Sequence, residues 1–206
     1  MGFFERNRQS LLEKGYSPER LPPGQYYTER YPVLHVGDVP QLDPAVWTLR
    51  VFGLVDAERT FSWDALHALP VADVTVDIHC VTKWSKFDMH WQGVRVRDLL
   101  DVVGVQASAT HVLQHAEYGY TTNTPLAEVL AENALVAWSV DGEALPPEHG
   151  GPLRMVIPRL YFWKSAKWLR GLELLDHDQP GFWEQNGYHN VGDPWLEQRY
   201  WGDAPG

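Results

Sequence analysis

Cys80 is the only cysteine of the 206 residues, and its surroundings could make it a reactive group. It closes a segment in which Val74, Val76 and Ile78 alternate with polar residues, a pattern that predicts a β-strand with the sulfur on its inward face. Residues 81–86 follow with two lysines and two hydroxyl side chains, and a nearby positive field favours a thiolate. A lone buried cysteine can also be an inert small apolar residue, so both interpretations stay open.

A second group of residues with chemical potential lies in two motifs, His-Gly-Gly-Pro-Leu-Arg at 149–154 and Lys-Ser-Ala-Lys-Trp at 164–168. The paired glycines allow close backbone approach, and Arg154 offers several N–H donors. Ser165 and Lys167 add a hydroxyl and a point charge. Together they predict a site for a phosphate group. The alternative is a solvated basic loop, although this acidic chain concentrates cations here.

The composition argues against several classes of protein. Asp and Glu total 27 against 17 Lys and Arg, and a net charge of −10 argues against nucleic acid or an anionic membrane as partner. One cysteine excludes an intrachain disulfide framework. No signal-peptide pattern and no membrane-spanning run are present in the sequence, so we expect a cytoplasmic protein. The common nucleotide-loop, serine-hydrolase, zinc-protease and paired-cysteine motifs are also absent from it.

Short strands and helices must position these groups. Helical spacing predicts a helix from Val96 to a stop at Gly104, and Ser62 and Thr124 are expected to cap two short helices. Alternating or continuous apolar runs predict strands at 47–51, 73–80, 111–115, 135–140, 153–157 and 168–175. Strands outnumber helices without regular strand–helix alternation. We therefore predict an α+β fold of mixed, mostly β sheets with short peripheral helices.

Three segments divide the chain, and we interpret them as parts of a single structural domain. Residues 1–45 are rich in Pro, Tyr and charge, which predicts an extended N-terminal arm laid over the body. Residues 46–176 contain both chemical motifs and most of the predicted strands. Residues 177–206 are aromatic and irregular, and are expected to wrap the surface as a C-terminal tail.

Several sequence features follow one another in the order typical of a known family. They are His35, Asp77–Cys80, Gly119–Asn123, the motif at 149–154 and the motif at 164–168. In this order the chain resembles the molybdopterin-binding oxidoreductase domain of the sulfite oxidase family, above all small bacterial members related to the catalytic subunit of protein-methionine-sulfoxide reductase. The resemblance covers about residues 28–176 and implies that 46–176 form a molybdopterin-binding catalytic domain of the sulfite oxidase type.

The resemblance implies a molybdenum-molybdopterin cofactor and assigns residues to it. Cys80 would ligate molybdenum as a thiolate, and Tyr120 falls where the family places a polar group over the substrate. The positions that match the family's pterin-binding residues are Tyr31, Leu34, His35, His115, Ala116, His149, Arg154, Ser165, Ala166 and Lys167. A soft thiolate suits a high-valent metal, and a phosphate site suits the anionic end of the cofactor.

The sequence also departs from the family pattern. Sulfite oxidases carry an arginine four residues before the cysteine and another in the arm, where this chain has Val76 and, approximately, Val33. This argues against sulfite as substrate, although Lys83 and Arg159 could supply charge instead. Aromatic residues near the motifs favour an uncharged sulfoxide or N-oxide, namely Trp84, Trp91, Tyr161 and Trp163. Because no haem-binding segment is present, we expect a small-molecule substrate and a separate electron-transfer partner.

Two other functions are compatible with these residues. The chain could bind the pterin without turnover, as a cofactor-binding or electron-transfer module. It could instead be a zinc enzyme in which Cys80 acts with His35, His115 or His149. The direction of an oxygen-atom transfer also stays open, because oxidation of a sulfite-like anion and reduction of a sulfoxide use the same chemistry in opposite senses.

Overall fold

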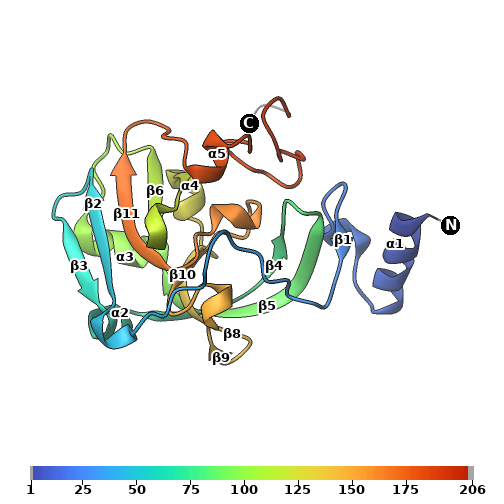
Figure 1. Cartoon of the computed structure of the whole chain (residues 1–206), viewed down its shortest axis with the longest axis horizontal. Helices are drawn as coiled ribbons and strands as arrows, with labels where there is room; N and C mark the ends of the chain where they lie inside the picture. The colour runs from blue at the N-terminus through green and yellow to red at the C-terminus, as the bar shows by residue number, and fades with distance from the viewer. Residues whose placement is uncertain (1, 204–206) are drawn as a thin grey trace.

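The computed structural model describes residues 2–203, which form two mixed β-sheets (Figure 1). In the larger sheet β1, β5, β8 and β10 lie in that order, while β4 pairs with β5 and β9 pairs with β8. Only β1 and β5 run parallel among the pairs of this sheet in the described chain. Its strands are β1 (Tyr26–Tyr27), β4 (Val71–His79), β5 (Trp84–Arg95), β8 (Leu135–Val140), β9 (Glu143–Ala144) and β10 (Arg154–Val156).

The second sheet has the strand order β3-β2-β11-β6-β7. Its strands are β2 (Thr48–Gly53), β3 (Arg59–Ser62), β6 (His111–Ala116), β7 (Thr121–Pro125) and β11 (Leu169–Leu175). β2 and β11 are parallel, and the other neighbours are antiparallel. The two sheets confirm the predicted α+β fold with mixed, mostly antiparallel strands.

The helices are short, as the sequence predicts. They are α1 (Phe3–Glu13), α2 (Trp63–His67), α3 (Val96–Val103), α4 (Leu126–Val129) and α5 (Phe182–Gln185), with 3-10 turns at η1 (Pro18–Arg20), η2 (Pro44–Val46), η3 (Glu117–Gly119), η4 (Pro147–His149) and η5 (Phe162–Lys164). The Ser62 hydroxyl accepts a hydrogen bond from Ala65 N and caps α2, and Gly104 ends α3 at φ 68°. Thr124 and Pro125 belong to β7, so α4 starts two residues after its predicted cap at Thr124.

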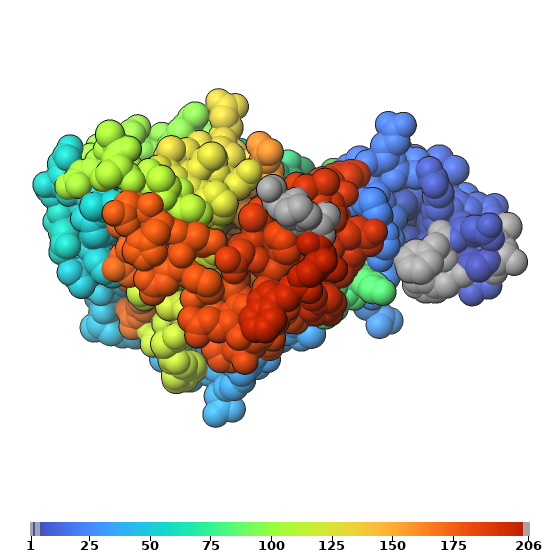
Figure 2. Space-filling view, turned by 90° about the horizontal axis from the view of Figure 1, so that it is seen from above, coloured from blue at the N-terminus to red at the C-terminus, as the bar shows by residue number. Residues whose placement is uncertain are grey.

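The N-terminal segment differs from the extended arm predicted for residues 1–45, because it begins with helix α1. This helix stands out from the body beside β1 (Figures 1 and 2). Leu11 is fully buried, and the Asn7 side chain exchanges two hydrogen bonds with the backbone of Tyr27. Residues 28–43, called the strap below, have no regular secondary structure and cross the face of the molecule from β1 toward α2 (Figure 1).

The described part of the tail, residues 177–203, covers one face of the domain (Figure 2). α5 is fixed to the body by Glu184, whose fully buried carboxylate lies 2.7 Å from Lys164 Nζ. A cluster of buried residues under this face contains Ile78, Cys80 and Met89. The inward parity predicted for Cys80 is therefore correct. Within residues 2–203 no helix has the length and hydropathy needed to cross a membrane.

Candidate active site

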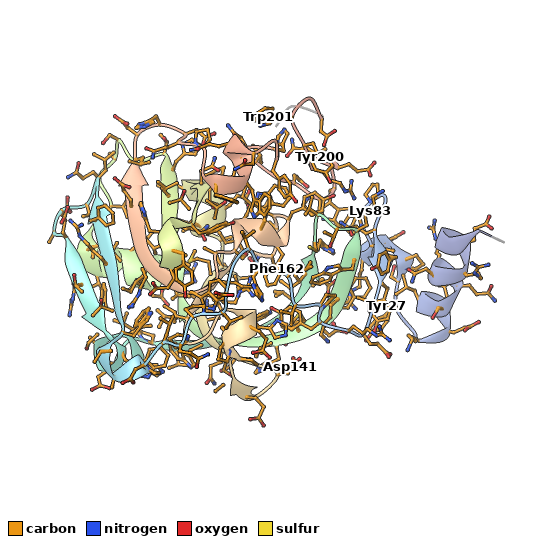
Figure 3. All side chains as sticks on the ribbon, viewed as in Figure 1. Tyr27, Lys83, Asp141, Phe162, Tyr200 and Trp201 are labelled. Carbon is orange, nitrogen blue, oxygen red and sulfur yellow. The ribbon has the colours of Figure 1, made fainter. Side chains whose placement is uncertain are left out.

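A cavity of about 420 Å³ lies where the strap, the turn after β4, the loop between β10 and β11, and the tail meet. This volume is in the range of ligand sites in proteins. Phe162, one of its wall residues, lies in the middle of the molecule (Figure 3). The predicted site residues that line the cavity are Tyr31, Leu34, His35, Cys80, Tyr120, His149, Arg154, Ser165, Ala166 and Lys167.

Cys80 directly follows β4 and is held in place by a tight turn. Its N–H donates to Trp84 O at 2.9 Å, and its carbonyl accepts from Lys83 N at 2.9 Å. The turn requires a left-handed backbone at Lys83, with φ 75°. It also brings the Thr82 hydroxyl within 3.2 Å of the Cys80 sulfur. The sulfur thus faces the cavity with a hydrogen-bond donor beside it.

The surroundings of Cys80 act in both directions on the thiolate that the sequence predicts. Burial raises the pKa of the Cys80 thiol, while hydrogen bonds from Thr82 and Val81 and the charge of Lys167 act against this shift. Lys83 is exposed at the periphery and does not line the cavity (Figure 3). The positive charge that acts on the sulfur therefore comes from Lys167, which is distant in the sequence, and not from the adjacent Lys83.

Arg154 is the buried cation at the centre of the cavity wall, with 1% of its surface exposed. Its N–H groups donate to His149 O at 2.7 Å, Ser165 O at 2.9 Å and the Tyr31 hydroxyl at 3.0 Å. Its guanidinium also lies 4.0 Å from the centre of the Phe162 ring. None of these partners among the described residues is a carboxylate, so the arginine charge is not neutralised by the protein.

Lys167 is a second cation without a carboxylate partner in the described chain. Its ammonium donates to two backbone carbonyls, Glu148 O at 2.7 Å and Leu34 O at 2.8 Å. Burial, followed by repulsion from Arg154, lowers the pKa of Lys167 to about 7. Gly150 explains how the chain approaches so closely, because a Cβ there would lie 2.9 Å from Lys167 Cβ.

The strap contributes an aromatic ring and a carbonyl to the cavity wall. The Tyr31 ring stacks on His149 with centroids 3.7 Å apart, and the His35 ring meets Trp168 at 5.8 Å. Burial, then the charges of Lys167 and Arg154, lower the pKa of His149 to about 4, so its ring is neutral at pH 7. His149 Nδ1 is buried and has no hydrogen-bond partner among residues 2–203.

An aromatic wall, defined as Tyr120, Trp163, Phe182, Trp183 and Tyr188, closes another side of the cavity. The Trp183 and Tyr188 rings are stacked with centroids 4.8 Å apart. The Tyr120 hydroxyl donates to Trp163 O at 3.0 Å, and burial raises its pKa well above the usual value. The sequence indicated Tyr120 and Trp163 but not the three tail residues, whose only signal was the aromatic content of the tail.

Of the remaining predicted site residues, Ser165 and Ala166 lie at the cavity, whereas His115 and Ala116 lie away from it. Ser165 Oγ accepts a hydrogen bond from Ile157 N at 2.9 Å, and Ala166 N donates to Gln114 Oε1 at 3.0 Å. His115 and Ala116 do not line the cavity. His115 Nε2 instead lies 2.8 Å from Glu173 on a neighbouring strand. A role for His115 and Ala116 in cofactor binding stays a prediction that the cavity geometry does not support.

The structure does not support Lys83 or Arg159 as sources of charge for the substrate, and it does not support the zinc alternative. Arg159 pairs with Glu128 at 3.2 Å and, like Lys83, is absent from the cavity wall. Across the described residues no group of three or more His, Cys, Asp or Glu side chains is placed to hold a metal ion. The zinc ligand sets proposed from Cys80 and the histidines are therefore not assembled.

The donors of the cavity fit the cofactor implied by the sequence resemblance. Two cations, Arg154 and Lys167, have only neutral partners among residues 2–203 and suit an anionic group. Buried ring nitrogens on the wall, His149 Nδ1 and Trp84 Nε1, lack protein partners in the same part of the chain. The Cys80 sulfur supplies a soft ligand in the same cavity. Such a site can hold a polar ligand with an anionic end and a thiolate-bound metal.

Comparison with known proteins shows which family the chain belongs to. The model of the oxidoreductase molybdopterin binding domain matches residues 36–183. The chain is 51% identical over 199 residues to "Uncharacterized oxidoreductase YuiH" of Bacillus subtilis strain 168, covering 96% of this chain and 98% of that protein.

More distant relatives are longer than this chain. It is 27% identical over 184 residues to the protein-methionine-sulfoxide reductase catalytic subunit MsrP of Gluconobacter oxydans, covering 78% of this chain and 59% of MsrP. The sulfane dehydrogenase SoxCD of Paracoccus pantotrophus has a similar fold, with a TM-score of 0.64 and 20% identity. That match covers 81% of this chain and 47% of the SoxCD chain.

Proposed function

Because this chain belongs to the family of oxidoreductase molybdopterin-binding domains and is a molybdenum oxidoreductase of the sulfite oxidase type, we propose that Cys80 is its metal ligand and that it reduces a small uncharged S-oxide or N-oxide. The cofactor of the family is molybdenum-molybdopterin. When bound, it supplies oxygen-atom transfer coupled to a change of two electrons at the metal. The observation that carries the proposal is one cavity containing the Cys80 sulfur, two unneutralised cations and the aromatic wall.

The cations are proposed to hold the anionic end of the cofactor. Lys167 and Arg154 carry charge without a carboxylate partner in the described chain, and a phosphate would provide the missing negative charge. His149, neutral at pH 7, offers Nδ1 as a polar contact to the pterin. Tyr31 stacks on His149 and keeps that ring in place from the strap.

The aromatic wall is the basis for proposing an uncharged substrate. Trp163, Trp183 and Tyr188 offer apolar ring faces to the cavity. Tyr120 is proposed to lie over the substrate as part of this wall, because it lines the cavity and its hydroxyl is held by Trp163 O. Reduction of the oxide consumes two electrons and two protons and yields the reduced compound and one water. MsrP, a relative named for such a reaction, is consistent with this direction.

We further propose that the two electrons come from a separate protein or small-molecule donor. The described chain offers one cavity of a size for the cofactor, and the sequence has no haem-binding segment. The cytoplasmic location inferred from the sequence stays a prediction.

The test compares wild type with Cys80→Ser, each produced in a host that makes the cofactor. We expect stoichiometric molybdenum and pterin in wild type, and oxidation of a reduced viologen dye with dimethyl sulfoxide, methionine sulfoxide or trimethylamine N-oxide. Cys80→Ser should retain pterin and lose turnover together with the sulfur-to-metal absorption band. An unchanged absorption band in Cys80→Ser would contradict ligation by the sulfur, and molybdenum-loaded wild type without turnover on any oxide would indicate a binding module.

A further inference from the structure

Thr82 is the side chain in the described structure that donates a hydrogen bond to the Cys80 sulfur. The Thr82 Oγ1 and Cys80 Sγ atoms are 3.2 Å apart, within the range for a hydrogen bond to sulfur. Thr82 also lines the cavity, so its hydroxyl and the sulfur share the same local environment. The position of Thr82 is fixed by the turn closed between Lys83 N and Cys80 O.

From this contact we infer that Thr82 is a positioning residue. The hydrogen bond that its hydroxyl donates to the Cys80 sulfur raises the reduction potential of the metal. The inference rests on the proposed ligation by Cys80. A donor to a thiolate draws electron density onto the sulfur, so the sulfur gives less density to the metal. The reduced metal is then favoured, as expected where hydrogen bonds to ligand sulfur tune redox centres.

The backbone also donates to this sulfur, which makes the contribution of the side chain separable. The N–H groups of Val81 and Thr82 lower the pKa of the Cys80 thiol as well. These two amides belong to the turn and persist with any side chain at position 82 that keeps the turn. A substitution at Thr82 that keeps the shape and removes the hydroxyl therefore removes one donor and leaves the other two.

The higher reduction potential expected from this contact also suits an oxide reductase. The enzyme must accept two electrons from its donor before the oxide is reduced, and a higher potential favours that loading step. Lys167 and Arg154 contribute positive charge in the same cavity and act in the same direction. Thr82 differs from them because it touches the sulfur directly, so its effect is expected on the metal spectrum as well as on the potential.

The experiment measures molybdenum content, the sulfur-to-metal absorption band and the midpoint potential of the loaded protein for wild type, Thr82→Val, Thr82→Ala and Thr82→Ser. Valine matches threonine in shape and alanine avoids crowding the cavity, and both lack the hydroxyl. We expect a tenfold lower ratio of reduced to oxidised metal at a fixed potential in both, about 30 mV for a two-electron couple. The absorption band should shift in the same two variants, while Thr82→Ser behaves as wild type.

Each other outcome overturns the inference. Equal potentials and spectra in all four proteins would show that the hydroxyl does not act on the ligand. A Thr82→Ser protein as altered as Thr82→Val would show that the methyl group matters instead. Loss of molybdenum from Thr82→Val and Thr82→Ala alone would assign the hydroxyl to cofactor retention.

Failure of the proposed function gives a different result. Wild type without molybdenum, or a Cys80→Ser protein with the wild-type absorption band, would remove the basis for ligation itself. Wild type with molybdenum and a sulfur band, but with Thr82 variants identical to it, would remove only the role of Thr82.

Discussion

Lys164 and Lys167 are three residues apart in one loop, and burial lowers the pKa of both, yet they have different partners. Lys164 is fully buried and its ammonium lies 2.7 Å from the carboxylate of Glu184, which opposes the shift. Lys167 faces the cavity and donates to two neutral carbonyls. One lysine is paired with a carboxylate of the protein, and the other has only neutral partners among the described residues and is left for a ligand.

The difference separates a structural ion pair from a binding group. Glu184 also accepts from the Thr122 hydroxyl and from Trp163 Nε1, both at 2.9 Å, so Lys164 belongs to a network that fixes α5. Because α5 begins at Phe182, this network holds the aromatic wall in position. Lys167 has no such network, and its cost of burial is expected to be offset when an anion binds.

The largest effect is expected from Lys164→Met. The change leaves the Glu184 carboxylate buried without its cation, which should lower the free energy of unfolding by about 3–5 kcal/mol. Urea denaturation of the cofactor-free protein measures this loss. The double variant Lys164→Met with Glu184→Gln should recover part of it, because the unpaired charge is gone. A loss below about 1 kcal/mol in the single variant would contradict the structural role.

The same substitution at Lys167 should weaken cofactor binding without lowering the stability of the fold. Lys167→Met removes donors only from two carbonyls and also removes a charge that is costly to bury, so the free energy of unfolding should not fall at pH 7. The cofactor should dissociate about 10- to 100-fold faster, because a charged hydrogen bond contributes about 1.5–3 kcal/mol. Release of pterin, followed by fluorescence, checks this rate, with Lys167→Arg as the charge-retaining control. Equal retention in wild type and Lys167→Met would remove Lys167 from the binding site.

A further expected effect is a pH dependence of stability in the cofactor-free protein. The pKa of Lys167 is about 7 in the folded chain and 10.5 as its ordinary value, so the unfolded chain binds more protons between these limits. Stability of wild type relative to Lys167→Met should therefore rise as the pH increases from about 7 to 10.5, with the full penalty present below pH 7. Urea denaturation at several pH values measures the difference. A flat or falling difference would show that the Lys167 ammonium is not destabilised by burial.

Local sequence patterns predicted much of the site. The alternation before Cys80 predicted an inward sulfur, and the motif at 149–154 identified Arg154 and its neighbours at the cavity wall. The positive charge near Cys80 comes from a different lysine than the sequence indicated, because Lys83 lies at the periphery while Lys167 acts on the sulfur. Helix α1 was also missed, since its Pro-rich and Tyr-rich continuation dominated the composition of the first 45 residues.

By itself the sequence determined the local features: a strand ending in the single cysteine, a glycine-rich loop with an arginine, and a motif with two lysines. These follow from side-chain periodicity and residue type within a few positions of the chain. Only the tertiary structure decided which lysine is neutralised and which is left for a ligand, because Glu184 reaches Lys164 from beyond β11. The hydroxyl beside the sulfur was likewise decided in three dimensions, since its contact depends on the backbone angles of a turn that residue types alone do not specify.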